Sequence, residues 1–268
     1  MYLGIDIGGT KTLLGVLDND GSLVQKLRFP TPQDYEEFMR ELKNNLTKLT
    51  IRDFQAAGVG APGILDRKNG IGLTFAHLKW KNVALQADLE SLVKAPVRIE
   101  NDAKLAGLSE AMLRKNISRL LYITISTGIG YALIKDQQID TNIGDSGGSL
   151  LLFEHQGKMV PWESYASGKA IVQAYHQKAK NIHDPAIWHS IAHRLSQGFM
   201  ALIAVTEPDL IIVGGSVGNY LGRYLDPLTK ELKQFETPLL KIPSIEQAQR
   251  PDDAVLYGCY DLVHTNYE

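Results

Sequence analysis

The chain has 268 residues, of which 44% are hydrophobic and 22% are charged, and its formal net charge is −2. These values are typical of a globular protein and exclude collagen-like, coiled-coil and disordered classes. The sequence shows neither the basic stripe of a nucleic-acid or membrane-surface binder nor an apolar run near the roughly 20 residues of a membrane span. The start of the sequence also lacks a signal-peptide pattern, so we expect a cytoplasmic protein with no nucleic-acid or membrane partner.

The chain opens with three short β-rich runs separated by glycine-containing turns. Tyr2–Ile7, Thr12–Leu17 and Leu23–Arg28 predict an antiparallel meander, and Asp20-Gly21 is typical of its last hairpin turn. The elements predicted after the meander are a helix at Gln33–Leu49, a strand at Ala56–Gly60, a helix at Leu85–Val93, a strand at Val97–Glu100 and a helix at Ala103–Leu113.

The same order then starts again. The elements predicted in this second half are strands at Leu120–Ser126 and Gly130–Lys135, helices at Gly168–Ala179 and Pro185–Val205, a strand at Leu210–Val213, a helix at Tyr220–Phe235, a weaker strand at Ile242–Glu246 and a helix from Asp253 to Val263. A repeated hairpin-opened α/β pattern predicts two related α/β lobes with a cleft between them. We place the N-terminal lobe at residues 1–115, joined by the C-terminal helix 253–268, and the C-terminal lobe at residues 116–252.

The most informative motif is Asp6-Ile7-Gly8-Gly9-Thr10-Lys11, at the turn between the first two strands. Gly8 and Gly9 let the backbone approach a polyphosphate closely, and the exposed amides with the Thr10 hydroxyl can donate to it. Asp6 is a hard oxygen ligand suited to a hydrated Mg²⁺ beside those phosphates. An ordinary Gly-Gly hairpin turn is the alternative interpretation.

Two turns of the second half are candidates for the same chemistry. Ser126-Thr127-Gly128-Ile129-Gly130 occupies the position that Asp6–Lys11 has in the first half, although Thr-Gly-x-Gly is also a common hairpin. Gly214-Gly215-Ser216 follows an apolar strand, where ligands sit in α/β folds, or it is simply a turn that starts a helix.

Glu100-Asn101-Asp102-Ala103 lies at the end of a predicted strand, directly before a helix. Asn and Asp are good helix N-caps, which would explain the motif by structure alone. In a catalytic interpretation, Asp102 is a general base towards a hydroxyl and Asn101 orients that substrate. The residues alone favour neither interpretation.

In order and spacing, the motifs of this chain resemble the ROK family (repressor, open reading frame, kinase) of sugar kinases and sugar-responsive regulators. The resemblance covers nearly the whole chain. The segments that carry it are Asp6–Lys11, Gly60–Gly63, Glu100–Ala103, Thr127–Gly130, Glu163–Gly168, Ile212–Gly215 and the closing Asp252-Asp253-Ala254 with Gly258.

The resemblance implies an actin/hexokinase-like fold, in which two ribonuclease-H-like lobes close over ATP and a sugar. It implies that Asp102 is the catalytic base and that Asp6 holds Mg²⁺ through the ATP phosphates. Together with the turns above, it gives the nucleotide-binding positions as Gly8, Gly9, Thr10, Lys11, Thr127, Gly128, Gly130, Gly214 and Gly215. The sugar-binding positions it implies are Gly63, Asn101, Asp102, Asp145 and Glu163.

The sequence departs from the family pattern near the implied sugar site. Asp145-Ser146-Gly147-Gly148 stands where the family has Glu-x-Gly-His, and Phe153–Trp162 replaces a cysteine-rich zinc loop. With Cys259 as the single cysteine, we expect no zinc site. Gly148 in place of His would open a space for a sugar that is bulkier at C1 or C2. Alternatively, His155 or Trp162 refills the gap.

We therefore interpret the chain as an ATP- and Mg²⁺-dependent hexose kinase acting at C6, with Asp102 as general base. Its partners would be a small-molecule sugar and ATP, and a homodimer is compatible with this reading. The main alternative is a catalytically degenerate sugar-binding or regulatory ROK protein. A polymerising actin-like protein is a further alternative, but it would not need the Asn101-Asp102 pair.

Overall fold

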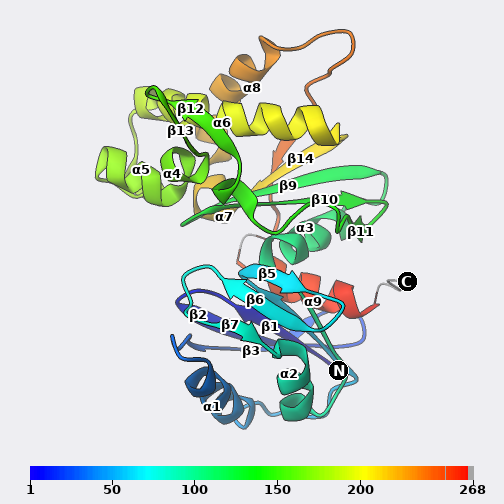
Figure 1. Cartoon of the computed structure of the whole chain (residues 1–268). Helices are drawn as coiled ribbons and strands as arrows, with labels where there is room; N and C mark the ends of the chain where they lie inside the picture. The colour runs from blue at the N-terminus through cyan, green and yellow to red at the C-terminus, as the bar shows by residue number, and fades with distance from the viewer. Residues whose placement is uncertain (251, 265–268) are drawn as a thin grey trace. The chain divides into compact units, whose positions relative to one another are not determined.

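The computed structural model describes residues 1–250 and 252–264. Residue 251 and the last four positions of the predicted segment 253–268 lie outside the described residues. The chain forms two compact units, one of residues 1–112 with the segment from Asp252, the other of residues 113–251. Figure 1 labels their elements. Among the described residues, no helix is long and apolar enough to span a membrane.

The first unit is built on a five-stranded sheet with the order β3-β2-β1-β4-β8. The predicted meander is confirmed: β1 pairs antiparallel with β2, and β2 with β3. β4 and β8 extend the sheet in parallel with β1. The strand bounds are Tyr2–Ile7 (β1), Lys11–Leu17 (β2), Leu23–Pro30 (β3), Ala56–Ala61 (β4) and Val97–Asn101 (β8).

The two faces of this sheet are covered in different ways. One face packs large apolar side chains such as Leu3 and Ile5 against α1 (Tyr35–Leu46) and α2 (Leu85–Val93). The other face carries glycines: a Cβ on Gly58 would overlap the backbone of Cys259, in α9 (Ala254–His264). The last helix of the chain therefore lies directly on the first strands, where α9 also contacts α3 (Asp102–Met112) (Figure 1).

A second, three-stranded sheet in this unit escaped sequence-based prediction. It consists of β5 (Gly63–Asp66), β6 (Ile71–Phe75) and β7 (Lys81–Val83). These strands are short, and their burial does not alternate regularly, so the period-2 signal of a half-buried strand is weak here.

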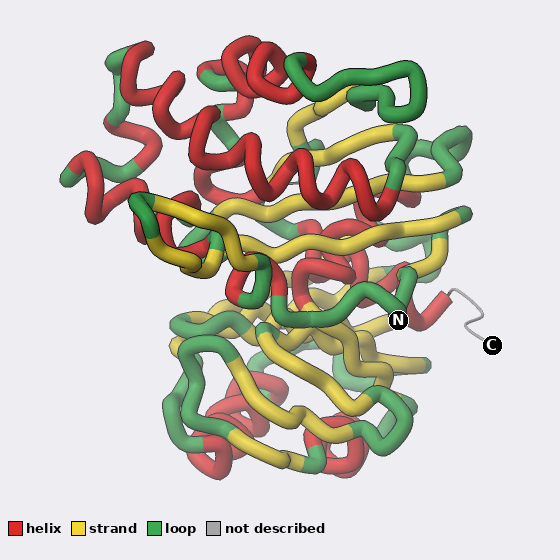
Figure 2. Tube along the Cα trace, turned by 45° about the horizontal axis from the view of Figure 1, so that its top comes forward, coloured by secondary structure: helices red, strands yellow, loops and turns green. Residues whose placement is uncertain are grey.

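The second unit repeats the first sheet with the strand order β11-β10-β9-β14-β15. β9 and β10 are antiparallel, and β14 and β15 continue in parallel with β9. The repeat predicted from the sequence is thus confirmed, although the short strand β11 was not predicted. Figure 2 shows the strands of the chain in yellow. The strand bounds are Arg119–Ile125 (β9), Ile129–Lys135 (β10), Gln138–Ile139 (β11), Leu210–Gly214 (β14) and Ser244–Gln247 (β15).

Helix α6 (Pro185–Thr206) is the longest helix of the described residues and contributes many side chains to the core of this unit. Its cap Asp184 accepts a hydrogen bond from the amide of Ala186 at 2.8 Å, and Pro185 occupies the first turn, where its missing N–H has no partner to lose. Leu195 and Phe199 are fully buried against the sheet. The other elements here are β12 (Leu152–His155), β13 (Lys158–Pro161), α4 (Glu163–Ala166), α5 (Gly168–Tyr175), α7 (Gly215–Gly218) and α8 (Leu225–Lys233).

The single helix predicted at Tyr220–Phe235 is wrong in its first turn. Leu221–Arg223 form a short 3-10 turn, and α8 starts only at Leu225. Between them Tyr224 is fully buried, and its ring stacks on Trp188 at 5.5 Å between centroids. The break follows from this packing: the backbone leaves the helical region at Tyr224 (φ −133°).

Candidate active site

The turn between β1 and β2 is closed tightly at Gly8. The amide of Gly8 donates to the carbonyl of Lys11 at 3.0 Å, and a Cβ on Gly8 would lie only 2.7 Å from that oxygen. Gly9 lies against the side chain of His77. Thr10 and Lys11 are exposed, so the hydroxyl and the ammonium group can reach a ligand.

Asp6 and Asp102 come together because of strand order. Asp6 stands near the end of β1, and Asp102 directly follows the end of β8, two strands away in the same parallel part of the sheet. Burial and the negative charge of Asp102 raise the pKa of Asp6 from 3.8 to about 7, against the opposing charge of Lys11. The structure thus brings together two carboxylates that are 96 positions apart in sequence.

This surrounding of Asp6 suits a divalent cation. Asp253 adds further negative charge, although its carboxylate is ion-paired with Lys26. Among the described residues, no group of three or more His, Cys, Asp or Glu side chains could hold a metal ion by itself. A cation at Asp6 would therefore take most of its oxygen ligands from phosphates and water, which is how Mg²⁺ is usually bound.

Asn101 performs the capping role that the sequence left open. Its side-chain oxygen accepts from the amides of Ala103 at 3.0 Å and Lys104 at 3.3 Å, at the start of α3. Its side-chain NH₂ donates to the carbonyl of Gly63 at 3.1 Å. The cap makes Asp102 the first residue of the helix, and the same Asn101 side chain is bonded to Gly63. Three residues of the implied sugar site, Gly63, Asn101 and Asp102, therefore lie together.

A charged pair next to Asn101 was not predicted from the sequence. Glu100 is 3% exposed, and both of its carboxylate oxygens accept from the Arg67 guanidinium, one from Nε at 2.8 Å. The Glu100 carboxylate also accepts a hydrogen bond from the backbone amide of Asn101. No local signal connects two residues 33 positions apart, so only the tertiary structure reveals this pair.

In the second unit, the Thr-Gly-x-Gly turn is fastened by Glu163. The carboxylate of Glu163 accepts from the amide of Ile129 at 2.8 Å, and any Cβ on Gly128 would overlap it. Gly128 is therefore required by close packing. Thr127 is exposed at the tip of the turn, and Gly130 is half-buried in β10.

Gly214 and Gly215 lie next to this turn, because β14 pairs in parallel with β9 and ends beside it. The Ser126 hydroxyl accepts from the amide of Ser216 at 3.1 Å, and the Ser126 carbonyl accepts from Gly168 at 2.7 Å. Gly215 has φ +82°, a backbone conformation that L side chains rarely adopt. Ser126 thus joins the two predicted nucleotide turns.

The open space expected at Gly148 is absent. Gly148 is buried, and a Cβ there would lie 3.1 Å from Ile129 Cβ and 3.3 Å from Trp162 Cε3. Trp162 is fully buried and donates its indole N–H to the Arg194 carbonyl at 3.1 Å. Of the two side chains expected to refill the gap, it is therefore Trp162 that does so, because the His155 ring stacks on Tyr165 instead. Asp145 is half-buried in the loop that precedes Gly148.

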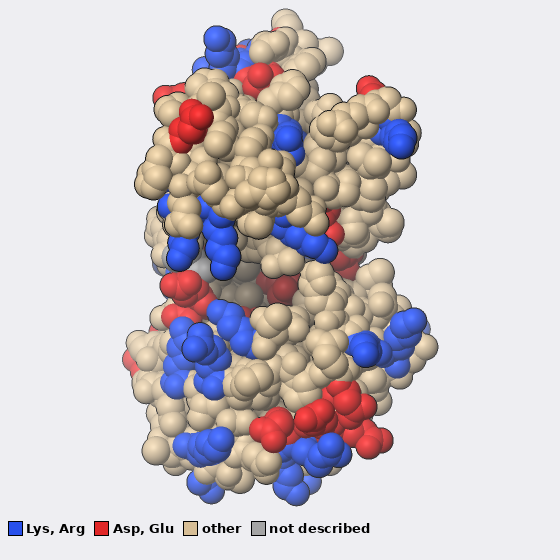
Figure 3. Space-filling view, turned by 90° about the vertical axis from the view of Figure 1, so that its left-hand side faces the viewer, with Lys and Arg blue, Asp and Glu red and all other residues tan. Residues whose placement is uncertain are grey.

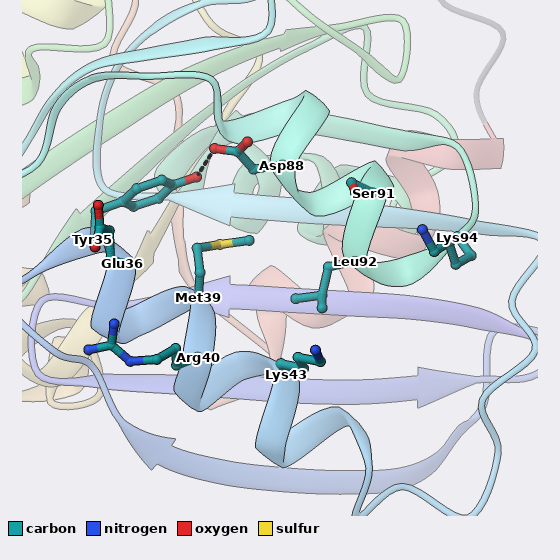
Figure 4. A pocket seen from close by; sticks show the side chains of 9 residues that line it. All are labelled: Tyr35, Glu36, Met39, Arg40, Lys43, Asp88, Ser91, Leu92 and Lys94. Atoms are coloured by element: carbon teal, nitrogen blue, oxygen red, sulfur yellow. Dashed lines mark hydrogen bonds between the residues drawn. The ribbon is translucent and has the colours of Figure 1, made fainter.

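A surface groove lies elsewhere in the first unit, between α1 and α2 (Figure 4). Tyr35, Met39 and Leu92 line it together with charged side chains, and the Tyr35 hydroxyl donates to Asp88 at 2.9 Å. It contains none of the predicted site residues. The face in Figure 3 shows acidic and basic side chains interspersed.

Comparison with known proteins identifies the relatives of this chain. The ROK family model matches residues 2–266. The chain belongs to the ROK family. A glucokinase of Streptomyces coelicolor is 25% identical over 311 residues, covering 98% of this chain and 97% of that protein. An N-acetyl-D-glucosamine kinase of Citrobacter koseri is 27% identical over 296 residues, covering 96% and 97%.

A solved ROK structure shares the fold. The crystal structure of a ROK family glucokinase from Streptomyces griseus, in complex with glucose and AMPPNP, has a TM-score of 0.82 at 24% identity. The match covers 97% of this chain and 98% of that one. The expected actin/hexokinase-like fold of the ROK family is thereby confirmed, and the repeated sheet order of the two units is its internal signature.

Proposed function

We propose that this ROK protein is an ATP-dependent sugar kinase that transfers the terminal phosphoryl group of ATP to the C6 hydroxyl of a hexose or hexose derivative. The observation that carries the proposal is the juxtaposition of Asp102, Asp6 and the Gly8-Gly9 turn in one unit. A hydroxyl-activating carboxylate, a carboxylate for a cation and a phosphate-binding turn are the three parts that phosphoryl transfer requires. The kinases among the relatives support the same activity.

Asp102 acts as general base and accepts the proton of the attacking hydroxyl. The hydroxyl oxygen forms a bond to the terminal phosphorus while the bond to the bridging oxygen of ADP breaks. Because such a transition state is loose, the protein contributes chiefly position and charge stabilisation. The N-cap made by Asn101 serves this role, since it holds Asp102 at one place on α3.

The sugar contacts are assigned to groups that still have hydrogen-bonding capacity. Asn101 donates one N–H to Gly63, which leaves its second N–H for a sugar hydroxyl. One Glu163 oxygen fastens Ile129, and the other is assigned to the sugar. Asp145 is assigned to the sugar by its place in the family motif alone.

The nucleotide contacts are assigned to the glycine turns. Gly8, Gly9, Thr10 and Lys11 bind the phosphates from the first unit, and Thr127, Gly128, Gly130, Gly214 and Gly215 belong to the second unit. When bound, Mg²⁺ neutralises part of the phosphate charge, and Asp6 is the carboxylate that would hold it.

A coupled ADP-release assay tests the proposal. Glucose, fructose, N-acetylmannosamine, N-acetylglucosamine and a β-glucoside would each be offered with MgATP. Sugar-dependent ADP release with at least one of them is the expected result. The alternative, a sugar-binding protein without phosphoryl transfer, predicts that a sugar raises the melting temperature while no ADP is released.

Because Trp162 fills the space at Gly148, a preference for sugars that are bulky at C1 or C2 is no longer expected.

A further inference from the structure

The loop between β6 and β7 rests on the phosphate-binding turn. Its backbone is fixed by hydrogen bonds: the Ala76 amide donates to the Pro62 carbonyl at 2.7 Å, and the Gln33 side chain donates to the His77 carbonyl at 3.1 Å. Leu78 and Trp80 are 7% and 3% exposed. The loop is thus held by the core on one side and by the segment before Gly63 on the other.

His77 has an unusual backbone conformation in this loop, with φ +63°. Eight non-glycine residues of the described chain have positive φ, and six of them occupy ordinary places. Lys94, His176 and Glu207 are helix C-caps, and Asp136, Gln137 and Gln156 are in two-residue hairpin turns. The other two, His77 and Asn82 (φ 51°), are at neither kind of place, and such outliers gather at functional sites. Of these two, His77 is the one that lies against Gly9.

The side chain of His77 covers Gly9. A Cβ on Gly9 would lie 3.0 Å from His77 Cβ and 3.7 Å from His77 Cδ2, so the imidazole stands beside the turn that binds phosphate. The residue is exposed. Within the described part of the chain, neither imidazole nitrogen has a hydrogen-bond partner, so the ring can donate to a ligand.

We propose that His77 contacts the substrate, its imidazole N–H donating a hydrogen bond to the terminal phosphate of ATP held at Gly8–Thr10. This inference rests on the proposed function, since it assigns ATP phosphates to that turn. Hydrogen bonds to charged acceptors are the stronger ones, which gives a contact at this place a measurable effect on nucleotide binding. It would also explain why a non-glycine residue is kept at φ +63°.

The test compares two nucleotides on three variants. His77→Gly removes the imidazole and accommodates the positive φ, and His77→Asn tolerates the same backbone while keeping a shorter N–H donor. His176→Gly is the matched control, an exposed His with φ 55° at the C-cap of α5. Affinities for MgADP and for a Mg-bound, non-hydrolysable ATP analogue would be measured by calorimetry, alongside melting temperatures.

We expect His77→Gly to bind the ATP analogue about tenfold more weakly or worse, while its affinity for ADP stays within about twofold. His77→Asn should recover part of the loss, and His176→Gly should match the wild type. Equal losses for both nucleotides, no loss for either, or the same loss in His176→Gly would overturn the proposal. Because binding is read without turnover, a failure to phosphorylate any sugar would refute the kinase assignment separately.

Discussion

Asp102 stands at the first position of α3, and its carboxylate accepts from the Ala103 amide at 2.8 Å. Asp102→Asn keeps the shape of the side chain but cannot accept the hydroxyl proton. We expect kcat to fall by about 10² or more, because general-base catalysis typically contributes 10²–10⁴-fold. Steady-state kinetics on the best sugar would measure this loss, with MgADP affinity as the control. Near-normal turnover would refute the assignment of Asp102 as base.

The raised pKa of Asp6 predicts that the stability of the metal-free protein depends on pH. Its pKa of about 7 in the folded state exceeds the ordinary 3.8, so the folded protein binds more protons between these values. The stability contribution of Asp6 is therefore complete below about pH 4 and is lost as the pH rises through about 7. Asp6→Asn cannot ionise and should lack this loss.

Thermal unfolding in EDTA at pH 5 and pH 8 would test this. The melting temperature of Asp6→Asn relative to wild type should rise from pH 5 to pH 8, by roughly 2–4 °C for each kcal/mol of stability regained. A difference that is the same at both pH values would mean that Asp6 is not buried next to another carboxylate. In the same variant, the Mg²⁺ requirement of turnover should increase.

At the scale of elements, the contact of α9 with the sheet depends on glycine. A Cβ on Gly58 would overlap the Cys259 backbone, and a Cβ on Gly258 would overlap the Leu105 backbone in α3. Backbone cannot move aside as a flexible side chain can. The last helix of the chain therefore completes the unit that begins at residue 1, and it does so at the strand that leads to the Pro62-Gly63 segment.

Gly58→Ala should destabilise the protein by about 2 kcal/mol or more, within or above the 1–3 kcal/mol typical of overpacking. Gly222→Ala is the control, because a Cβ at Gly222 would meet nothing within 4 Å, and its effect should stay within about 0.5 kcal/mol. Urea unfolding followed by circular dichroism would give both values. Equal midpoints for the two variants would contradict the close packing of α9 on β4.

For the whole molecule, we predict that purified protein contains no stoichiometric zinc. A structural zinc site needs four nitrogen or sulfur ligands, usually with several cysteines. The chain has one cysteine, Cys259, whose pKa burial raises far above its ordinary value. The segment from Leu152 to Pro161 is a β-hairpin held by backbone pairing. Elemental analysis of protein prepared without added metal is the measurement, and one zinc per chain would refute the prediction.

The repeated α/β order and the glycine turn between the first two strands could be predicted from the sequence alone, and phosphate binding at that turn stays a prediction. Both depend on short-range chemistry: apolar periodicity marks a strand or a helix wherever it lies, and adjacent glycines at a strand end make a turn that can approach phosphate. The first sheet begins with the predicted meander, and the second repeats its order. Of the two interpretations of Asn101-Asp102, the capping one is confirmed, because the Asn101 side chain accepts from the amides of Ala103 and Lys104, while the catalytic role of Asp102 stays a prediction.

Which residues far apart in the sequence come into contact depends on the tertiary structure. Arg67 with Glu100, His77 with Gly9, and Glu163 with Ile129 are pairs whose partners lie on different elements, so their contact depends on strand order and on how tightly the elements pack. The same reason explains the error at Gly148. A missing side chain opens a space only if its neighbours leave the space empty, and in this protein Trp162 and Ile129 fill it.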